Sequence, residues 1–151
     1  MKISVIGTGY VGLVTGVCFA ELGNEVKCID IDKEKIEKLK KGVSPIYEPG
    51  IEKLLKKNIK NGRLKFFDNI KEGITKAEVV FIAVGTPSKD DGTVETKYVE
   101  VAAADIGRAL GHYAVIVNKS TVPIGTGEKV KDIISKNYTD ASPKIIFALQ
   151  V

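Results

Sequence analysis

The first twelve residues constrain the fold more than any other part of the chain. A short apolar stretch, residues 3–6, runs directly into the sequence GTGYVG, residues 7–12, which has the spacing G-x-G-x-x-G. Between a strand and a helix, Gly7 permits a tight turn, Gly9 lets the main chain approach a pyrophosphate, and Gly12 lets the helix pack on the strand. The free N–H groups and the dipole of that helix favour phosphate at this point.

The residues that follow support a dinucleotide site over the alternative, a tight turn with no ligand. An apolar helix is predicted from Leu13 to Leu22 and ends at Gly23, a residue typical of helix C-termini. A second apolar strand, residues 26–29, then ends in Asp30. A carboxylate roughly 20 residues past the glycines is placed to accept hydrogen bonds from adenosine ribose hydroxyls.

The rest of the chain alternates helices with strands, as expected of a doubly wound parallel α/β sheet, a Rossmann fold with helices on both faces. Two prolines make residues 43–50 irregular, and residues 78–84 form an almost continuous β-branched and aromatic run. That run predicts a strand near the sheet centre, buried on both faces. The other expected elements are helices at about 32–41, 51–60, 96–110 and up to 136, strands at 64–67, 114–117 and 144–149, and a short helix capped by Asp68 or Asn69.

Polar residues follow two later strands at the points where those strands end. Thr86 follows the central run, and Ser120 and Thr121 follow the strand at 114–117. Because the carboxyl ends of parallel strands share one rim, these residues are expected to meet the glycine turn and Asp30 in one cleft. Their hydroxyls would then lie at the nicotinamide end of a cofactor; the alternative is that they are helix caps or turn residues.

Composition excludes several classes of function. With 44% hydrophobic and 28% charged residues in 151, the chain is one ordinary globular domain, and no apolar run reaches the roughly 20 residues of a membrane span. The net charge of +4 comes mainly from lysines on the polar faces of helices, which argues against nucleic-acid binding. With no leader pattern at its start, the protein is expected in the cytoplasm.

The residues with reactive side chains show no catalytic or metal-binding pattern. Cys18 and Cys28 lie in a predicted helix and a predicted strand without ligand spacing, so both are expected to be buried, reduced thiols, and no metal is expected. The single histidine, His112, sits in a turn before a strand and is given no catalytic role.

Several separate motifs, in order, resemble one known family. The segments GTGYVGLVTGVCFAELG, IDID with Lys35 following, SPIYEPG, FIAVGTP and NKSTVPIGT are similar to those of the UDP-glucose/GDP-mannose dehydrogenase family across essentially the whole chain. The resemblance implies that residues 1–151 are an NAD-binding domain. The family's central dimerising region and C-terminal UDP-binding domain would lie outside these residues.

The resemblance also implies an activity and a set of site residues. Family members oxidise the C6 alcohol of a nucleotide sugar, such as UDP-glucose to UDP-glucuronate, with two NAD and a cysteine thioester, and the full-length protein would be a homodimer. In this sequence Tyr10, Val11 and the neighbouring glycines would contact the pyrophosphate, and Asp30 and Lys35 the adenosine ribose. The nicotinamide side would be contacted by Thr86, Ser120 and Thr121, and Thr121 would also hold a catalytic water.

This sequence departs from the family pattern at its C-terminal end. The family continues into an Asn-Pro-Glu-Phe-Leu-like segment with a catalytic glutamate, whereas this chain runs Phe147-Ala148-Leu149-Gln150-Val151. Neither cysteine matches the family's nucleophile, so these residues alone are expected to be inactive. Two alternatives stay open: a UDP-N-acetylmannosamine or GDP-mannose dehydrogenase, and a free-standing nucleotide-sensing Rossmann module, in which the SPIYEPG and KSTVP segments would have no evident role.

Overall fold

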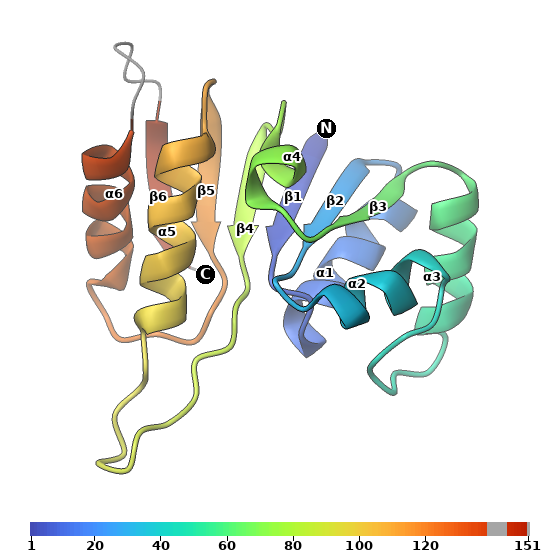
Figure 1. The fold of residues 1–151 in the computed structure, drawn as a ribbon, viewed down its shortest axis with the longest axis horizontal. Coiled ribbons are helices and arrows are strands. Elements are labelled where there is room, and N and C mark those ends of the chain that lie inside the picture. The colour runs from blue at the N-terminus through green and yellow to red at the C-terminus, as the bar shows by residue number, and fades with distance from the viewer. Residues whose placement is uncertain (139–144, 151) are drawn as a thin grey trace.

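The chain folds as strands alternating with helices, with the strands in one sheet (Figure 1). The computed structural model describes residues 1–138 and, in the course of the backbone, residues 145–150. In that part of the chain the elements are β1 (Lys2–Ile6), α1 (Tyr10–Glu21), β2 (Glu25–Ile29), α2 (Lys33–Lys40), α3 (Ile51–Lys60), β3 (Leu64–Phe67), α4 (Ile70–Ile74), β4 (Val79–Ile82), α5 (Lys97–Ala109), β5 (Ala114–Asn118), α6 (Thr126–Asn137) and β6 (Ile145–Gln150).

The six strands described form one parallel sheet in the order β3-β2-β1-β4-β5-β6. This is the strand order of the Rossmann fold, and it confirms the predicted doubly wound architecture. The order reverses between β1 and β4, which pair from Ile3↔Val79 to Ile6↔Ile82. Ligands of open parallel sheets bind at such a reversal, beyond the carboxyl ends of the strands.

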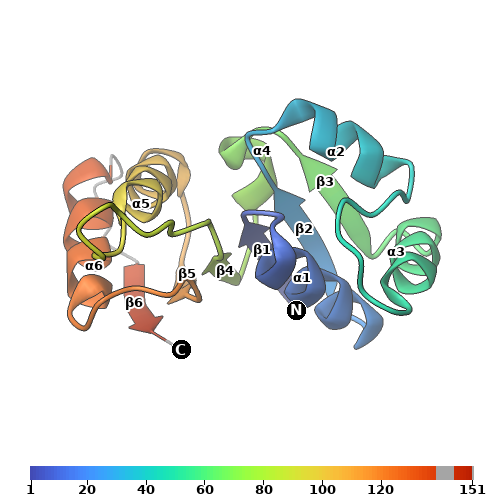
Figure 2. The same ribbon diagram turned by 90° about the horizontal axis from the view of Figure 1, so that it is seen from below.

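Helices lie on both faces of the sheet, as predicted (Figure 2). On one face α1 and α3 pack together over β1, β2 and β3, around a core that includes Val5, Leu13 and Leu55. On the other face α5 and α6 pack together over the second half of the sheet, with Ile82, Ile106 and Ile134 buried between them. The rigid scaffold of the site therefore has two cores, one on each side of the sheet.

Local sequence signals explain the element ends. Asp32 caps α2 by accepting a hydrogen bond from the Lys35 N–H, and Asn69 caps α4 in the same way. Gly23, Gly42 and Gly62 follow helix ends with positive φ, as expected of C-terminal glycines. Residues 43–50 contain no helix or strand, as their prolines predict. The predicted last strand is present as β6, although its expected first residue, Lys144, lies outside the described residues.

The prediction that residues 78–84 are buried on both faces is wrong. The strand β4 is central, but only its Val80 and Ile82 side chains are fully buried, whereas Val79 and Phe81 on the opposite face are half-buried. The physical reason is that α1 and α3 pack on β1 to β3 and make no substantial contact with β4 or β5. In the described part of the chain, that face of β4 is covered only in part, by the Phe19 ring of α1 against the Phe81 ring.

Candidate functional site

The glycine turn has the backbone geometry that its spacing predicts. Gly7 has a φ of +98°, and a Cβ there would lie 2.5 Å from the Ala83 carbonyl oxygen. A Cβ on Gly12 would lie 1.9 Å from the Gly7 carbonyl oxygen. Beside Gly9, by contrast, no described heavy atom other than those of Gly9 and its chain neighbours lies within 4 Å of the position a Cβ would take. Gly7 and Gly12 are therefore required for packing, whereas Gly9 leaves open space at the start of the helix.

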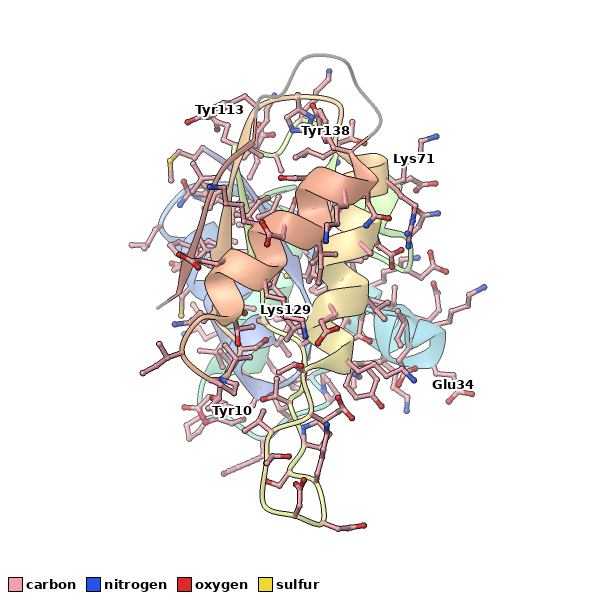
Figure 3. The ribbon with its side chains drawn as sticks, turned by 90° about the vertical axis from the view of Figure 1, so that its left-hand side faces the viewer. Tyr10, Glu34, Lys71, Tyr113, Lys129 and Tyr138 are labelled. Atoms are coloured by element: carbon pink, nitrogen blue, oxygen red, sulfur yellow. The ribbon has the colours of Figure 1, made fainter. Side chains whose placement is uncertain are left out.

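The N-terminus of α1 is free to bind an anion. Gly9 is the N-cap, no side chain caps the helix, and its first turn contains no acidic residue. Tyr10 and Val11 are exposed there. Tyr10 lies toward the opposite end of the molecule from Tyr113 and Tyr138 (Figure 3). The Tyr10 hydroxyl donates a hydrogen bond to the Glu48 carboxylate, which raises the pKa of Tyr10. This contact ties the turn to the irregular segment 43–50.

Asp30 lies at the carboxyl end of β2 and is hydrogen-bonded to the glycine turn. Its Oδ2 accepts hydrogen bonds from the backbone N–H of Thr8 at 2.8 Å and from the Thr8 hydroxyl at 2.6 Å. Lys35 from α2 donates to the same oxygen at 3.0 Å. Oδ1 accepts the backbone N–H of Asp32 at 3.1 Å. The structure thus brings together Asp30 and Lys35, as expected, and adds Thr8, which sequence reasoning missed.

These contacts keep Asp30 ionised. Partial burial alone would raise the pKa of the Asp30 carboxyl. The donors from Thr8, Asp32 and Lys35 outweigh that effect, and the pKa is lowered from its ordinary value. At neutral pH the site therefore presents a fixed carboxylate beside a helix N-terminus, and the two together suit a ligand that carries both hydroxyls and phosphates.

A cavity of about 500 Å³ lies between the glycine turn, the end of β2 and the N-terminal half of α5. Gly7, Gly9, Asp30 and Lys35 form part of its wall. Apolar side chains form the remainder and provide the surroundings that a planar ring requires; they include Ile31, Ile70, Tyr98, Val101 and Ala102. Tyr98 and Val101 were not predicted as site residues. Both side chains are exposed on the surface of α5, and large apolar side chains at exposed helix positions could have indicated a ligand-binding surface.

Thr86, Ser120 and Thr121 lie at the carboxyl ends of neighbouring strands, on the same rim as the turn but outside this cavity. Thr86 is half-buried and Thr121 is exposed. Ser120 is 7% exposed, and its hydroxyl donates to the Val84 carbonyl at 2.9 Å. The Ser120 hydroxyl therefore links the ends of β4 and β5, so that only its acceptor capacity is left for a ligand.

Comparison with known proteins also indicates a dinucleotide-binding domain. Residues 1–150 match the model of the UDP-glucose/GDP-mannose dehydrogenase family, NAD binding domain. The chain belongs to this family. Its cofactor is therefore NAD, and Gly9, the free N–H groups of α1 and the Asp30 carboxylate fit the pyrophosphate and ribose of that molecule.

The relatives of this family domain are longer proteins. It is 55% identical over 135 residues to the UDP-glucose 6-dehydrogenase TuaD of Bacillus subtilis (strain 168), covering 89% of this chain and 29% of that protein. A UDP-glucose dehydrogenase structure from Pyrobaculum islandicum has a TM-score of 0.87 at 41% identity, over 90% of this chain and 32% of that one. A GDP-mannose dehydrogenase structure from Pseudomonas aeruginosa has a TM-score of 0.90 at 36% identity, over 97% and 35%.

The two cysteines of the family domain differ from each other. Cys28 is buried, as predicted, and desolvation raises its pKa to about 12. The prediction that Cys18 is buried is wrong: it is exposed, because it lies on the side of α1 that faces away from the sheet. The helix is apolar on all sides, so the apolar neighbours of Cys18 in the sequence did not indicate which side packs.

Three further observations concern the described residues. The His112 imidazole lies 2.8 Å from the Ala77 carbonyl oxygen, away from the cavity. In residues 1–138 and 145–150, no group of three or more His, Cys, Asp or Glu side chains is arranged to hold a metal. None of the helices described is long and apolar enough to cross a bilayer.

Proposed function

We propose that this family domain serves a UDP-glucose 6-dehydrogenase, which oxidises UDP-glucose to UDP-glucuronate with two NAD. The Asp30 carboxylate, held in the wall of the cavity that also contains Gly7 and Gly9, supports the NAD-binding part of the proposal. The 55% identity to the UDP-glucose 6-dehydrogenase TuaD supports the substrate. NAD supplies the hydride acceptor when bound. The chain's own residues bind and orient it: the turn and α1 hold the pyrophosphate, and Asp30 with Lys35 the adenosine ribose.

The remaining predicted residues complete this proposal on the nicotinamide side. Thr86 and Thr121 would contact the nicotinamide end of the cofactor, with Ser120 holding the two strand ends together behind them. Thr121, exposed on the rim, would position the water needed for the later steps. The full-length protein is expected to be a cytoplasmic homodimer, which sedimentation and cell fractionation would test.

The cofactor assignment is tested by calorimetry on the isolated chain. We expect NADH to bind at least about tenfold more tightly than NADPH, because the 2′-phosphate would lie against Asp30. Asp30→Asn should weaken NADH binding by about 1.5–3 kcal/mol, the usual worth of a hydrogen bond to a charged group. Asp91→Asn is the matched control, since Asp91 also accepts two bonds from a threonine but is exposed and outside the cavity. Equal affinity for NADH and NADPH would overturn the role of Asp30.

The enzymatic part of the proposal concerns the longer protein. A thioester step needs a thiolate with a lowered pKa, whereas burial raises that of Cys28 to about 12 and Cys18 lies on the outer side of α1. The isolated chain should bind NADH saturably but form no NADH from NAD and UDP-glucose. Steady turnover that Cys18→Ser or Cys28→Ser abolished would contradict this assignment.

A second candidate is an enzyme for another nucleotide sugar. The structure with the TM-score of 0.90 is a GDP-mannose dehydrogenase, and a UDP-N-acetylmannosamine dehydrogenase from Staphylococcus aureus reaches 0.83. Activity assays of the full-length protein with UDP-glucose, GDP-mannose and UDP-N-acetylmannosamine separate these candidates. A free-standing nucleotide sensor is disfavoured, because the relatives named above are dehydrogenases about three times the length of this chain.

A further inference from the structure

Thr8 occupies the position between the first two glycines of the turn, where the G-x-G-x-x-G motif specifies no residue type. It is 0% exposed, which is unusual for a polar side chain on a ligand-binding loop. Its backbone N–H and its hydroxyl both donate to Oδ2 of Asp30, at 2.8 and 2.6 Å. Two short bonds from one residue to one carboxylate oxygen, across 22 positions of sequence, hold the end of β2 against the turn.

The two carboxylate oxygens of Asp30 accept different numbers of hydrogen bonds. Oδ2 takes three donors, since Lys35 adds a third at 3.0 Å, and each oxygen of a carboxylate has about two lone pairs. Oδ1 takes only the Asp32 N–H, at 3.1 Å. The free acceptor capacity of Asp30 therefore lies on Oδ1.

We propose that Thr8 is a positioning residue for the cofactor: its hydroxyl fixes the Asp30 carboxylate so that Oδ1 stays available to a ribose hydroxyl. This inference rests on the proposed binding of NAD in the adjacent cavity. Without the Thr8 hydroxyl, Oδ2 keeps the Thr8 N–H and the Lys35 ammonium, and the carboxylate gains rotational freedom. Thr8 then contributes both to affinity for NAD(H) and to exclusion of a 2′-phosphate.

The test compares Thr8→Val, which removes the hydroxyl at nearly constant shape, with Thr8→Ser, which keeps it. We expect the Kd of NADH to rise about tenfold in Thr8→Val and to stay within about twofold of the parent in Thr8→Ser. The ratio of the NADPH and NADH dissociation constants should shrink in Thr8→Val only. Thr93→Val is the matched control, because Thr93 also donates its N–H and hydroxyl to one carboxylate, Asp91, in an exposed loop outside the cavity.

A second measurement separates positioning from general loss of structure. The Asp30 carboxyl, followed by NMR in the free protein, should titrate at higher pH in Thr8→Val than in the parent or Thr8→Ser, because the hydroxyl stabilises the ionised form. An unchanged Asp30 titration together with unchanged NADH and NADPH affinities would overturn the inference while leaving NAD binding intact. A parent chain that binds no NADH would overturn the proposed function and this inference with it.

Discussion

Each half of the sheet leaves part of one face without a helix, and the residues on the two open faces differ in kind. In the first half the region beside α4 is polar: Lys27 and Lys65 line a cavity of about 300 Å³, away from the glycine turn, and the buried Ser4 hydroxyl donates to the Gly73 carbonyl of α4. In the second half the open region is apolar: Val79, Phe81 and Val115 are half-buried on the side opposite α5 and α6.

The polar face is stable in contact with water. Lys27 donates hydrogen bonds to the Glu72 and Thr75 carbonyls, and its partial burial lowers its pKa. The valines and phenylalanine on β4 and β5 have the composition of a covered parallel sheet, although the described helices cover them only in part, through the contact between Phe19 of α1 and Phe81. The comparison teaches that an apolar run in a sequence reports residues suited to burial and does not identify the surface that buries them.

The largest expected effect comes from two adjacent valines of one strand. Val80 is fully buried beneath α5, whereas Val79 is half-buried on the open face. Val80→Ala should cost about 2–3 kcal/mol of unfolding free energy, and Val79→Ala under about 1, in urea unfolding of the isolated chain. Equal losses at the two positions would show that the open face is covered in solution.

A second prediction contrasts a closely packed glycine in the first half of the sheet, Gly16, with an unpacked glycine in the second half, Gly111. A Cβ on Gly16 of α1 would lie 2.4 Å from the Cys28 sulfur. At Gly111, before β5, no described heavy atom beyond its chain neighbours lies within 4 Å of the Cβ position. Gly16→Ala should therefore lose about 1–3 kcal/mol and Gly111→Ala close to none, measured by thermal unfolding. Combining Gly16→Ala with Cys28→Ala should recover part of the loss, because the obstructing sulfur is gone. Purely additive effects of the two substitutions would contradict that contact.

The buried thiol makes the first half sensitive to alkali. The folded pKa of Cys28, about 12, lies above the ordinary value of 9.0, so the folded chain keeps its proton while the unfolded chain loses it. Stability should therefore fall as pH rises from about 9 toward 12, by about 1.4 kcal/mol at pH 10, and Cys28→Ala should remove this component. A thiol reagent should label exposed Cys18 rapidly and Cys28 only on unfolding; comparable rates would contradict the burial of Cys28.

The smallest effect is expected for an ion pair between α5 and α6, the helices that cover one face of the second half of the sheet. Lys129 of α6 lies 2.6 Å from Glu100 of α5, but the lysine side chain is 55% exposed. Lys129→Met should therefore cost under about 1 kcal/mol, with the difference from the parent shrinking in high salt. A loss as large as that of Val80→Ala would mean that charge, and not apolar packing, holds α5 to α6.

The sequence predicted the elements more accurately than their surroundings. The helix 51–60 and the strand 64–67 were predicted with the bounds observed, because strong apolar periodicity and an Asn-Gly stop are local signals. The turn at Gly7 followed from its motif. The exposure of Cys18 and of the second face of β4 did not, since both depend on which neighbours the folded chain brings to an apolar surface.

The candidate site was predicted in part for the same reason. Asp30 and Lys35 lie where the motif spacing placed them, beside the glycine turn. Thr8 was missed because its role exists only once the end of β2 lies next to the turn, a contact across 22 positions. Tyr98 and Val101 belong to a helix far along the chain, and only the strand order brings that helix to the cavity.

The uncapped N-terminus of α1 links the cofactor to the lifetime of the protein itself. The first N–H groups of that helix have no side-chain cap, and no acidic residue offsets its dipole; an end of this kind gains more from a bound anion than a capped one. A ligand present at 100 times its Kd adds about 2.7 kcal/mol to folding stability. Cells rich in NAD would therefore keep a larger share of this protein folded and out of reach of proteases, so that the supply of cofactor would influence its abundance.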